Sequence, residues 1–272
     1  MGLFQNYSRP GPGVRKDQPK KKPFFLFFEI LARKFWDLIK LNLLFLIPAA
    51  LAVVMVLFLG SVTGLIPVIL IPLILVSPFV AGLAFVTRNY AREEHAFILS
   101  DFLSAVKNNW LAFLINGMVC YAVYLIISFS INFYAVQLKT NSMFYIPMFV
   151  CFIISVFFIF SQYYVPVLII TFDLKLNQIY KNSFIFAIVG LWRNLLLTVI
   201  LFVLIFCVYI MTQWMPLTFL IASVIIVCLL FSFCMFLINF TVYPLISKTM
   251  IEPYAKKEEN TDDKIFNEND IK

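Results

Sequence analysis

The chain has 272 residues, of which 62% are hydrophobic, 18% aromatic and 13% charged, and its formal net charge is +7. Soluble domains average roughly 45–50% apolar and 25% charged residues, so the composition excludes an ordinary soluble domain. Uncharged runs recur that are longer than the ~18 residues that a helix needs to cross a bilayer. The sequence therefore predicts an all-α membrane protein, because a helix pairs its own backbone polar groups in lipid and the runs are solidly apolar, without the alternation of membrane strands.

Two segments of different character precede the first long apolar run. Residues 1–22 form a polar arm rich in Lys, Arg, Pro and Gly, and we expect it in the cytoplasm, where its lysines can bind anionic headgroups; a topogenic signal alone is the alternative. Residues 23–40 are predicted to form an amphipathic helix in the plane of the headgroups; docking onto a partner protein is the alternative. The charged stripe of this helix consists of Glu29, Arg33, Asp37 and Lys40.

Residues 23–254 are predicted to form one membrane domain with six spanning helices. The spans are expected to pair as three helical hairpins that lie side by side, each preceded by an interfacial amphipathic helix. Short turns follow the first, third and fifth spans, and a charged, disordered tail is predicted over 255–272. The predicted spans are about 42–59, 65–87, 110–134, 144–171, 194–212 and 217–247.

The distribution of basic residues predicts the orientation of these spans. Of the 21 Lys and Arg residues, 20 lie in the arm, the interfacial stretches and the C-terminal segment, whereas Lys139 alone lies in a turn on the opposite side. Cytoplasmic segments carry the excess of Lys and Arg in membrane proteins, so both termini are expected in the cytoplasm. Basic residues beside apolar runs are typical of membrane insertion, and we expect no nucleic-acid partner.

A weak internal repeat is visible at the start of three spans. In each case basic residues, with a tryptophan nearby, lead into an asparagine, which is Asn42, Asn108 or Asn194. Asparagine can cap a helix, and tryptophan favours the membrane interface, so the repeat is consistent with three related hairpins. The alternative is that every span which leaves the cytoplasm begins in this way.

The segment Arg88–Trp110 is a charged island between two long uncharged blocks, and it contains the single histidine of the chain. Water must lie where this island lies, so it is expected at the membrane surface. We interpret its charged residues as a candidate docking site for a cytoplasmic or membrane partner; a simple solvated loop is the alternative. The candidate docking residues are Arg88, Arg92, Glu93, Glu94, His95 and Asp101.

The predicted spans contain no ionisable Asp, Glu, Lys, Arg or His, which argues against a pump that depends on buried carboxylates. Three amide side chains lie inside the predicted spans, and they are candidates for lining a path for a neutral, polyhydroxylated solute: Asn116, Gln162 and Asn239. More often such groups hold helices together.

No catalytic motif is present. The five cysteines lie inside predicted spans without metal-ligand spacing, and a lone histidine cannot form a His-based zinc site. No nucleophile elbow, P-loop or dinucleotide-binding fingerprint occurs. We therefore expect no enzyme activity, no metal and no cofactor.

Two stretches resemble the YesL-like family of bacterial integral membrane proteins. They are RPGPGVRKDQPKKKPFFLFFEILARKFWDLIKLN (Arg9–Asn42) and TRNYAREEHAFILSDFLSAVKNNW (Thr87–Trp110), of which the second is the more specific. The family has no known biochemical function, but its members are often encoded beside carbohydrate ABC-transporter genes. The resemblance implies a multi-pass protein of the bacterial cytoplasmic membrane with an accessory role in carbohydrate uptake, through contacts with ABC-transporter permease subunits. The alternative is an autonomous transporter or channel for neutral solutes.

Overall fold

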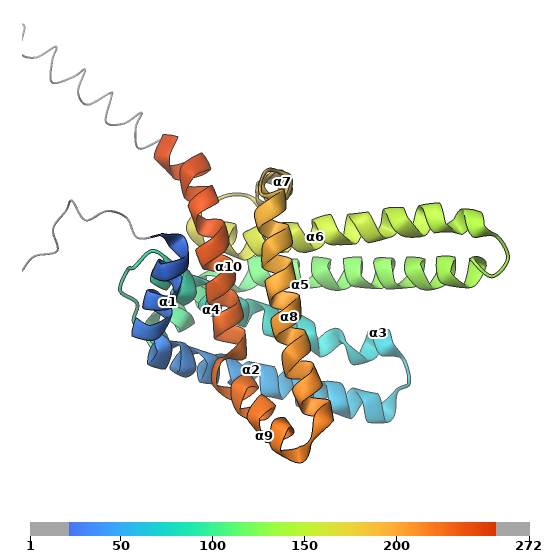
Figure 1. Ribbon diagram of the computed structural model, residues 1–272, viewed down its shortest axis with the longest axis horizontal. Helices are drawn as coiled ribbons and strands as arrows, with labels where there is room; N and C mark the ends of the chain where they lie inside the picture. The colour runs from blue at the N-terminus through green and yellow to red at the C-terminus, as the bar shows by residue number, and fades with distance from the viewer. Residues whose placement is uncertain (1–21, 254–272) are drawn as a thin grey trace, which may run out of the picture.

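The computed structural model describes residues 22–253, and in this part of the chain all regular structure is helical (Figure 1). Six segments are long and apolar enough to cross a membrane, which confirms the predicted fold class. The predicted arm, apart from Lys22, and the predicted tail at 255–272 lie outside the described residues. The candidate spans are Phe35–Val62, Ile66–Ala91, Ile98–Gln137, Ser142–Thr171, Leu191–Trp214 and Pro216–Ile251.

Several of these spans combine more than one type of helix. Two short 3-10 segments, η1 and η2, and two π-helical segments, η3 and η4, continue or precede α-helices. The elements in chain order are α1 (Pro23–Arg33), α2 (Phe35–Val62), α3 (Ile66–Ile69), η1 (Ile71–Val76), α4 (Ser77–Ala91), α5 (Ile98–Gln137), η2 (Ser142–Phe144), α6 (Tyr145–Thr171), α7 (Leu176–Val189), α8 (Leu191–Trp214), α9 (Pro216–Ile225), η3 (Ile226–Leu230), α10 (Phe231–Ile246) and η4 (Ser247–Ile251).

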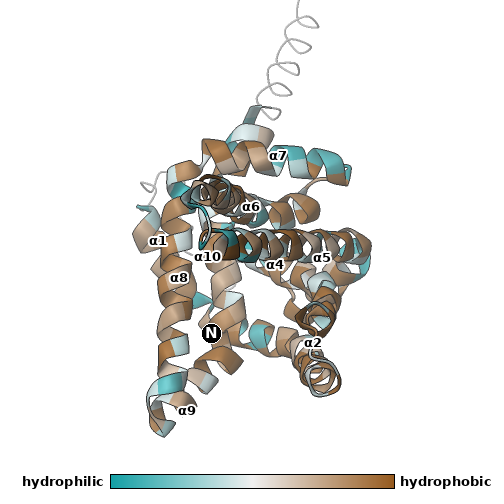
Figure 2. Ribbon diagram, turned by 90° about the vertical axis from the view of Figure 1, so that its right-hand side faces the viewer, coloured by the Kyte–Doolittle hydropathy of each residue, from teal (hydrophilic) through white to brown (hydrophobic). Residues whose placement is uncertain are grey.

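Two of the three hairpins follow one axis, and the third crosses them. α5 and α6 form the longest hairpin, and α2 lies along the same direction before the chain returns through α3 and α4 (Figure 1). α8 and α10 run across this direction, and α7 lies across the top of Figure 2. The structure differs here from the expected row of parallel hairpins, because α7 turns the chain away from α6 before α8 begins.

The three predicted interfacial helices have three different outcomes. The helix expected over 23–40 is divided at Lys34, so that its second part forms the first turns of α2. The second stretch is not a separate helix, because α5 continues without a break from Ile98 through the polar residues into the span. The third is a separate helix, α7. Helix continuity needs only backbone hydrogen bonds, so a change from polar to apolar residues does not by itself end a helix.

The second span is not a regular α-helix. Pro67, Pro72 and Pro78 lie within it, and the chain forms the short helix α3, then the 3-10 segment η1, then α4. Proline has no N–H to donate and its ring clashes with the preceding turn, which explains why the α-helical ladder is interrupted here.

Two clusters of buried apolar side chains hold the helices together. One cluster joins α1, α2, α4 and α10, where the ring of Phe27 stacks on that of Phe236 with centroids 5.2 Å apart. The other joins α6, α7, α8 and α10. α4 and α5 approach closely at Gly82, where an added Cβ would overlap the ring of Phe102. Small residues allow such approach between membrane helices.

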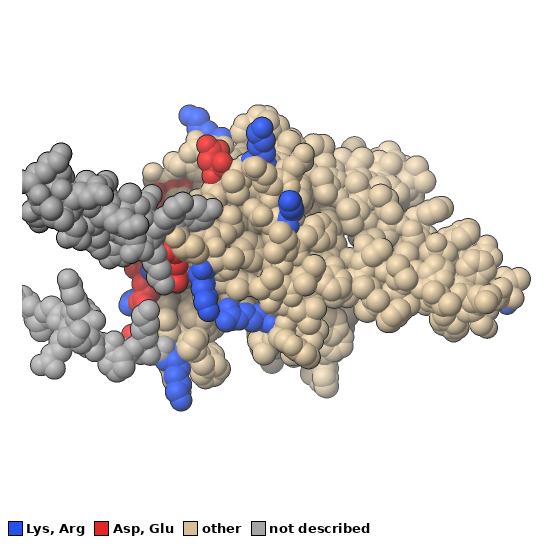
Figure 3. Space-filling view, turned by 90° about the horizontal axis from the view of Figure 1, so that it is seen from above, with Lys and Arg blue, Asp and Glu red and all other residues tan. Residues whose placement is uncertain are grey.

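The charged side chains gather at one end of the molecule. Figure 3 shows them around the end where the described part of the chain begins and ends, whereas the opposite half is almost free of charge. Apolar residues cover most of the remaining helices, and α7 carries the clearest group of hydrophilic residues in Figure 2. The predicted separation of a charged end from an apolar body is thus present in the fold.

Candidate functional site

The loop between α4 and α5 lies against α1 at the charged end. The Arg33 guanidinium of α1 donates to the Glu93 carboxylate at 2.9 Å, and Arg92 pairs with Glu94 at 2.6 Å. Arg92 also lies 5.3 Å from the centroid of the Tyr243 ring of α10. The loop is therefore fixed to two helices while its polar residues stay exposed. We call the exposed residues of α1 and of the loop 92–97 the α1–loop surface.

Local backbone geometry positions the loop residues. Glu93 has a φ of 58°, which is uncommon for a residue other than glycine. The N–H of Glu93 and that of Glu94 donate to carbonyls in the last turn of α4, so this left-handed residue ends the helix. At the start of α5, the Asp101 carboxylate accepts the N–H of Phe97 at 2.8 Å. The His95 ring packs on the ring of Phe97 with centroids 4.8 Å apart.

Arg88 differs from the other candidate docking residues, because it is buried. Its guanidinium donates to the Ile170 carbonyl at 2.8 Å and to the Thr171 hydroxyl at 3.0 Å, at the C-terminal end of α6. The same guanidinium also donates to the side-chain oxygen of Asn89. A cation is favourable at the carbonyl end of a helix. Arg88 therefore links α4 to α6 and is not part of the α1–loop surface.

Asn239 lies on α10 and is fully buried. Its amide nitrogen donates to the Thr87 hydroxyl at 2.7 Å, to the Ala84 carbonyl at 3.3 Å and to the Met235 carbonyl at 3.1 Å. Its donors are thus used between α10 and α4. The structure brings it into no hydrogen bond with the other two candidate path residues.

Asn116 and Gln162 do meet, in a small polar cluster between α5, α6 and α7. The Asn116 amide donates to the Gln162 side-chain oxygen at 3.3 Å, and the Cys120 thiol donates to the same oxygen at 3.3 Å. The Tyr180 hydroxyl of α7 donates to Asn116 at 2.7 Å. Burial raises the pKa of Tyr180 to about 12, so the hydroxyl keeps its proton at physiological pH. Each of these bonds joins two helices.

Two asparagines of the predicted repeat have a role that the sequence did not reveal. Asn42 and Asn194 are fully buried, and neither caps its own helix. Asn194 donates to the Ala187 carbonyl at 3.1 Å, at the end of α7, and accepts the Tyr164 hydroxyl at 2.8 Å. Asn42 donates to carbonyls of η3. Asn108 is exposed, so the third member of the repeat is not equivalent.

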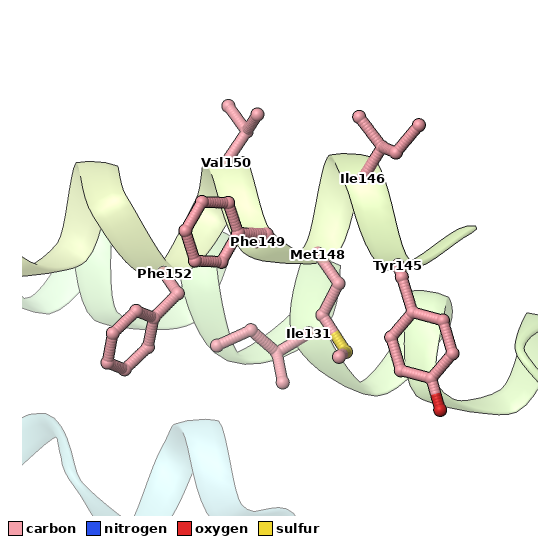
Figure 4. A pocket seen from close by; sticks show the side chains of 7 residues that line it. All are labelled: Ile131, Tyr145, Ile146, Met148, Phe149, Val150 and Phe152. Carbon is pink, nitrogen blue, oxygen red and sulfur yellow. The ribbon is translucent and has the colours of Figure 1, made fainter. Parts of the chain in front are cut away.

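An apolar groove of about 600 Å³ lies at the other end of the molecule, between α5 and α6 (Figure 4). It is lined by none of the candidate docking or path residues. Within residues 22–253, no group of three or more His, Cys, Asp or Glu residues is placed to hold a metal ion.

Comparison with known proteins finds one family. Residues 38–131 match the model of a family described as "Protein of unknown function, DUF624". The matched region runs from α2 through the charged loop into α5, so it includes Arg88 and every candidate docking residue, and its description names no activity. No curated protein matches the chain. No solved structure matches it either.

Proposed function

We propose that this multi-pass membrane protein acts by binding a partner protein at the α1–loop surface. The observation that supports this proposal is a charged loop, fixed by Arg33 and Tyr243, that presents Glu94 and His95 to solvent. A surface that is already ordered loses less conformational entropy on binding than a mobile one. Next to the loop, α1 exposes the rings of Phe24, Phe25 and Phe28, which offer apolar contact beside the charges.

The resemblance to the YesL-like family supplies the biological setting. It supports a bacterial cytoplasmic membrane, an accessory role in carbohydrate uptake and an ABC-transporter permease subunit as the partner. The concentration of Lys and Arg at the loop end favours a cytoplasmic location for that end and for both termini. The partner would then meet the α1–loop surface on the cytoplasmic side.

The alternative, an autonomous path for neutral solutes, has less support. The donors of Asn239 are used between α4 and α10, and Asn116 is bonded to Gln162 and Tyr180. Sugars are recognised by directed polar groups, and the groove between α5 and α6 offers none apart from one tyrosine hydroxyl. The hydrogen bonds that these amides make join helices.

The proposal is tested by affinity purification in a mild detergent from host cells grown on a complex glycan. The variant Glu94→Ala/His95→Ala removes two exposed groups, and with them the Arg92–Glu94 ion pair, but changes no residue of the Arg33–Glu93 pair or of the Arg92–Tyr243 contact. The matched control, Thr140→Ala/Ser142→Ala, changes two exposed polar residues at the opposite end. We expect permease subunits with the wild type and the control, and fewer with the variant. Recovery of the wild type without a transporter subunit would contradict the proposal.

A further inference from the structure

The groove between α5 and α6 is open and apolar. In Figure 4, Ile146 and Val150 project from α6 to one side, whereas Tyr145, Met148 and Phe152 project to the other side, where Ile131 of α5 meets them. The positions on α6 follow a spacing of three and four residues, so these side chains share one helix face. The groove lies within two candidate spans and has a volume of about 600 Å³. Its surroundings are therefore hydrocarbon.

The outer mouth of the groove is ordered and carries one charge. The turn that joins the two walls contains Lys139, which is exposed and makes no ion pair with any residue in the described range 22–253. The ring of Tyr134 stacks on that of Phe144 with centroids 6.2 Å apart, so each end of the turn is held to the other. Asn141 accepts the N–H of Met143 at 2.9 Å, which caps the next helical segment.

This arrangement has the two parts of a phospholipid site. A hydrocarbon chain fits the groove, because its walls provide close van der Waals contacts and require no hydrogen bond. A headgroup would then lie at the turn, where the unpaired ammonium group of Lys139 favours a negative charge. The turn between α2 and α3, at 63–65, lies at the same end and contains no charged residue. A partner that carries both an acyl chain and a negative charge can therefore use the groove and Lys139 together.

We propose that the groove retains a phospholipid with an anionic headgroup, its acyl chain along Ile131, Met148 and Phe152 and its phosphate at Lys139. This inference is independent of the docking function, since the two sites lie at opposite ends of the molecule. The proposed lipid stays bound to the protein, whereas the other lipids around the spanning helices exchange with the bilayer.

The test offers delipidated protein equal amounts of phosphatidylglycerol and phosphatidylethanolamine, and native mass spectrometry measures the retained lipid. Met148→Trp fills the groove and should abolish retention. Lys139→Glu should lower the retention of phosphatidylglycerol relative to phosphatidylethanolamine by about fivefold or more, because one ammonium group at a surface favours an anionic lipid by roughly that factor. Ile131→Trp fills the groove from α5 and replaces Met148→Trp if that variant does not fold.

The matched control is Phe202→Trp, which enlarges an exposed apolar side chain on α8 away from the groove. It should retain lipid as the wild type does. Retention that survives both groove-filling variants, or a wild type that binds the two lipids equally, would overturn the proposal. Retention lost in every variant, the control included, would also overturn it, because the lipid would then depend on general stability and not on this groove.

Discussion

The side chain of Asn42, in α2, accepts the backbone N–H of Ser232, at the start of α10, at 2.9 Å. The same amide donates to the carbonyls of Ile226 at 3.0 Å and Val227 at 2.7 Å. Ile226 and Val227 begin the π-helical segment η3, where the regular α-helical ladder of the last span is interrupted, and Ser232 follows its end. A buried backbone group without a partner is costly in lipid, so one asparagine completes the hydrogen bonding of a helix remote from it in sequence.

Substitution of Asn42 should therefore destabilise the last span. Asn42→Ala leaves two carbonyls and one N–H without their partner, and we expect a loss of about 2–3 kcal/mol in the free energy of unfolding. The measurement is equilibrium unfolding in mixed micelles.

The matched control is Asn132→Ala. Asn132 is an exposed asparagine whose amide bonds only the Ser128 carbonyl of its own helix. We expect a change within about 0.5 kcal/mol there. Equal effects at the two positions would show that Asn42 contributes no more than a generic polar residue.

The contact between Tyr164 and Gly190 predicts a non-additive pair of substitutions. An added Cβ at Gly190 would lie 2.5 Å from the Tyr164 hydroxyl oxygen, so Gly190→Ala should cost about 1–3 kcal/mol through overpacking. Tyr164→Phe removes the hydrogen bond to Asn194 and should cost about 1–2 kcal/mol. Because Tyr164→Phe also removes the clashing atom, the double variant should lose less than the sum of the two. Thermal unfolding in detergent measures all three.

Gly60→Ala is the control for this cycle, because no atom lies within 4 Å of the added Cβ and the position is inside α2. Replacing a helical glycine by alanine in open space should leave stability unchanged or raise it. Strict additivity of Gly190→Ala and Tyr164→Phe would count against the close approach of α7, α8 and α6 at this point.

The length of the apolar stretches and their lack of charge were sufficient to predict the class of the fold. A stretch such as 144–171 has to be helical in lipid whatever surrounds it, so the helix α6 begins and ends close to the predicted bounds. Polar stretches beside a span lie in water and can be helical or irregular, so their structure cannot be predicted from the length of the apolar runs. For that reason α5 extends over 40 residues, although only its apolar part was assigned to a span.

The partners of polar side chains could not be predicted, because they come from distant parts of the chain. Asn42 bonds a carbonyl 184 positions away, and Arg88 bonds one 82 positions away. The sequence marked Arg88 as exposed because it borders a charged island; burial against the end of α6 depends on how α4 packs. Glu94 and His95 are exposed in the loop, and their solvation depends mainly on their charged immediate neighbours; their role in docking stays a prediction.

Arg88 should behave as a structural residue and not as a docking residue. Arg88→Ala removes the donors to Ile170 and Thr171 at the end of α6, and we expect a loss of about 2–3 kcal/mol in unfolding free energy. Arg88→Lys keeps the charge but has a single nitrogen, so it should recover only part of that loss. Lys107→Ala, an exposed basic residue of the same island, is the control and should be near neutral. Loss of a partner with unchanged stability would instead indicate docking.

The raised pKa of Tyr180 predicts how the stability of the protein depends on pH in alkaline solution. Burial raises its pKa from the ordinary value of 10.0 to about 12, so the folded protein holds this proton more tightly than the unfolded chain does. The resulting contribution to stability is fully present below about pH 10 and is lost as pH rises towards 12. The Tyr180→Phe variant cannot titrate at this position, and it also loses the hydrogen bond to Asn116. It should therefore be less stable than the wild type at pH 8 and lose less stability between pH 10 and 12.

Unfolding measured at pH 8, 10 and 11.5 tests this, with Tyr209→Phe, at an exposed tyrosine of α8, as the control. Parallel pH profiles for the wild type and Tyr180→Phe would show that the Tyr180 hydroxyl is solvated and does not join α7 to α5.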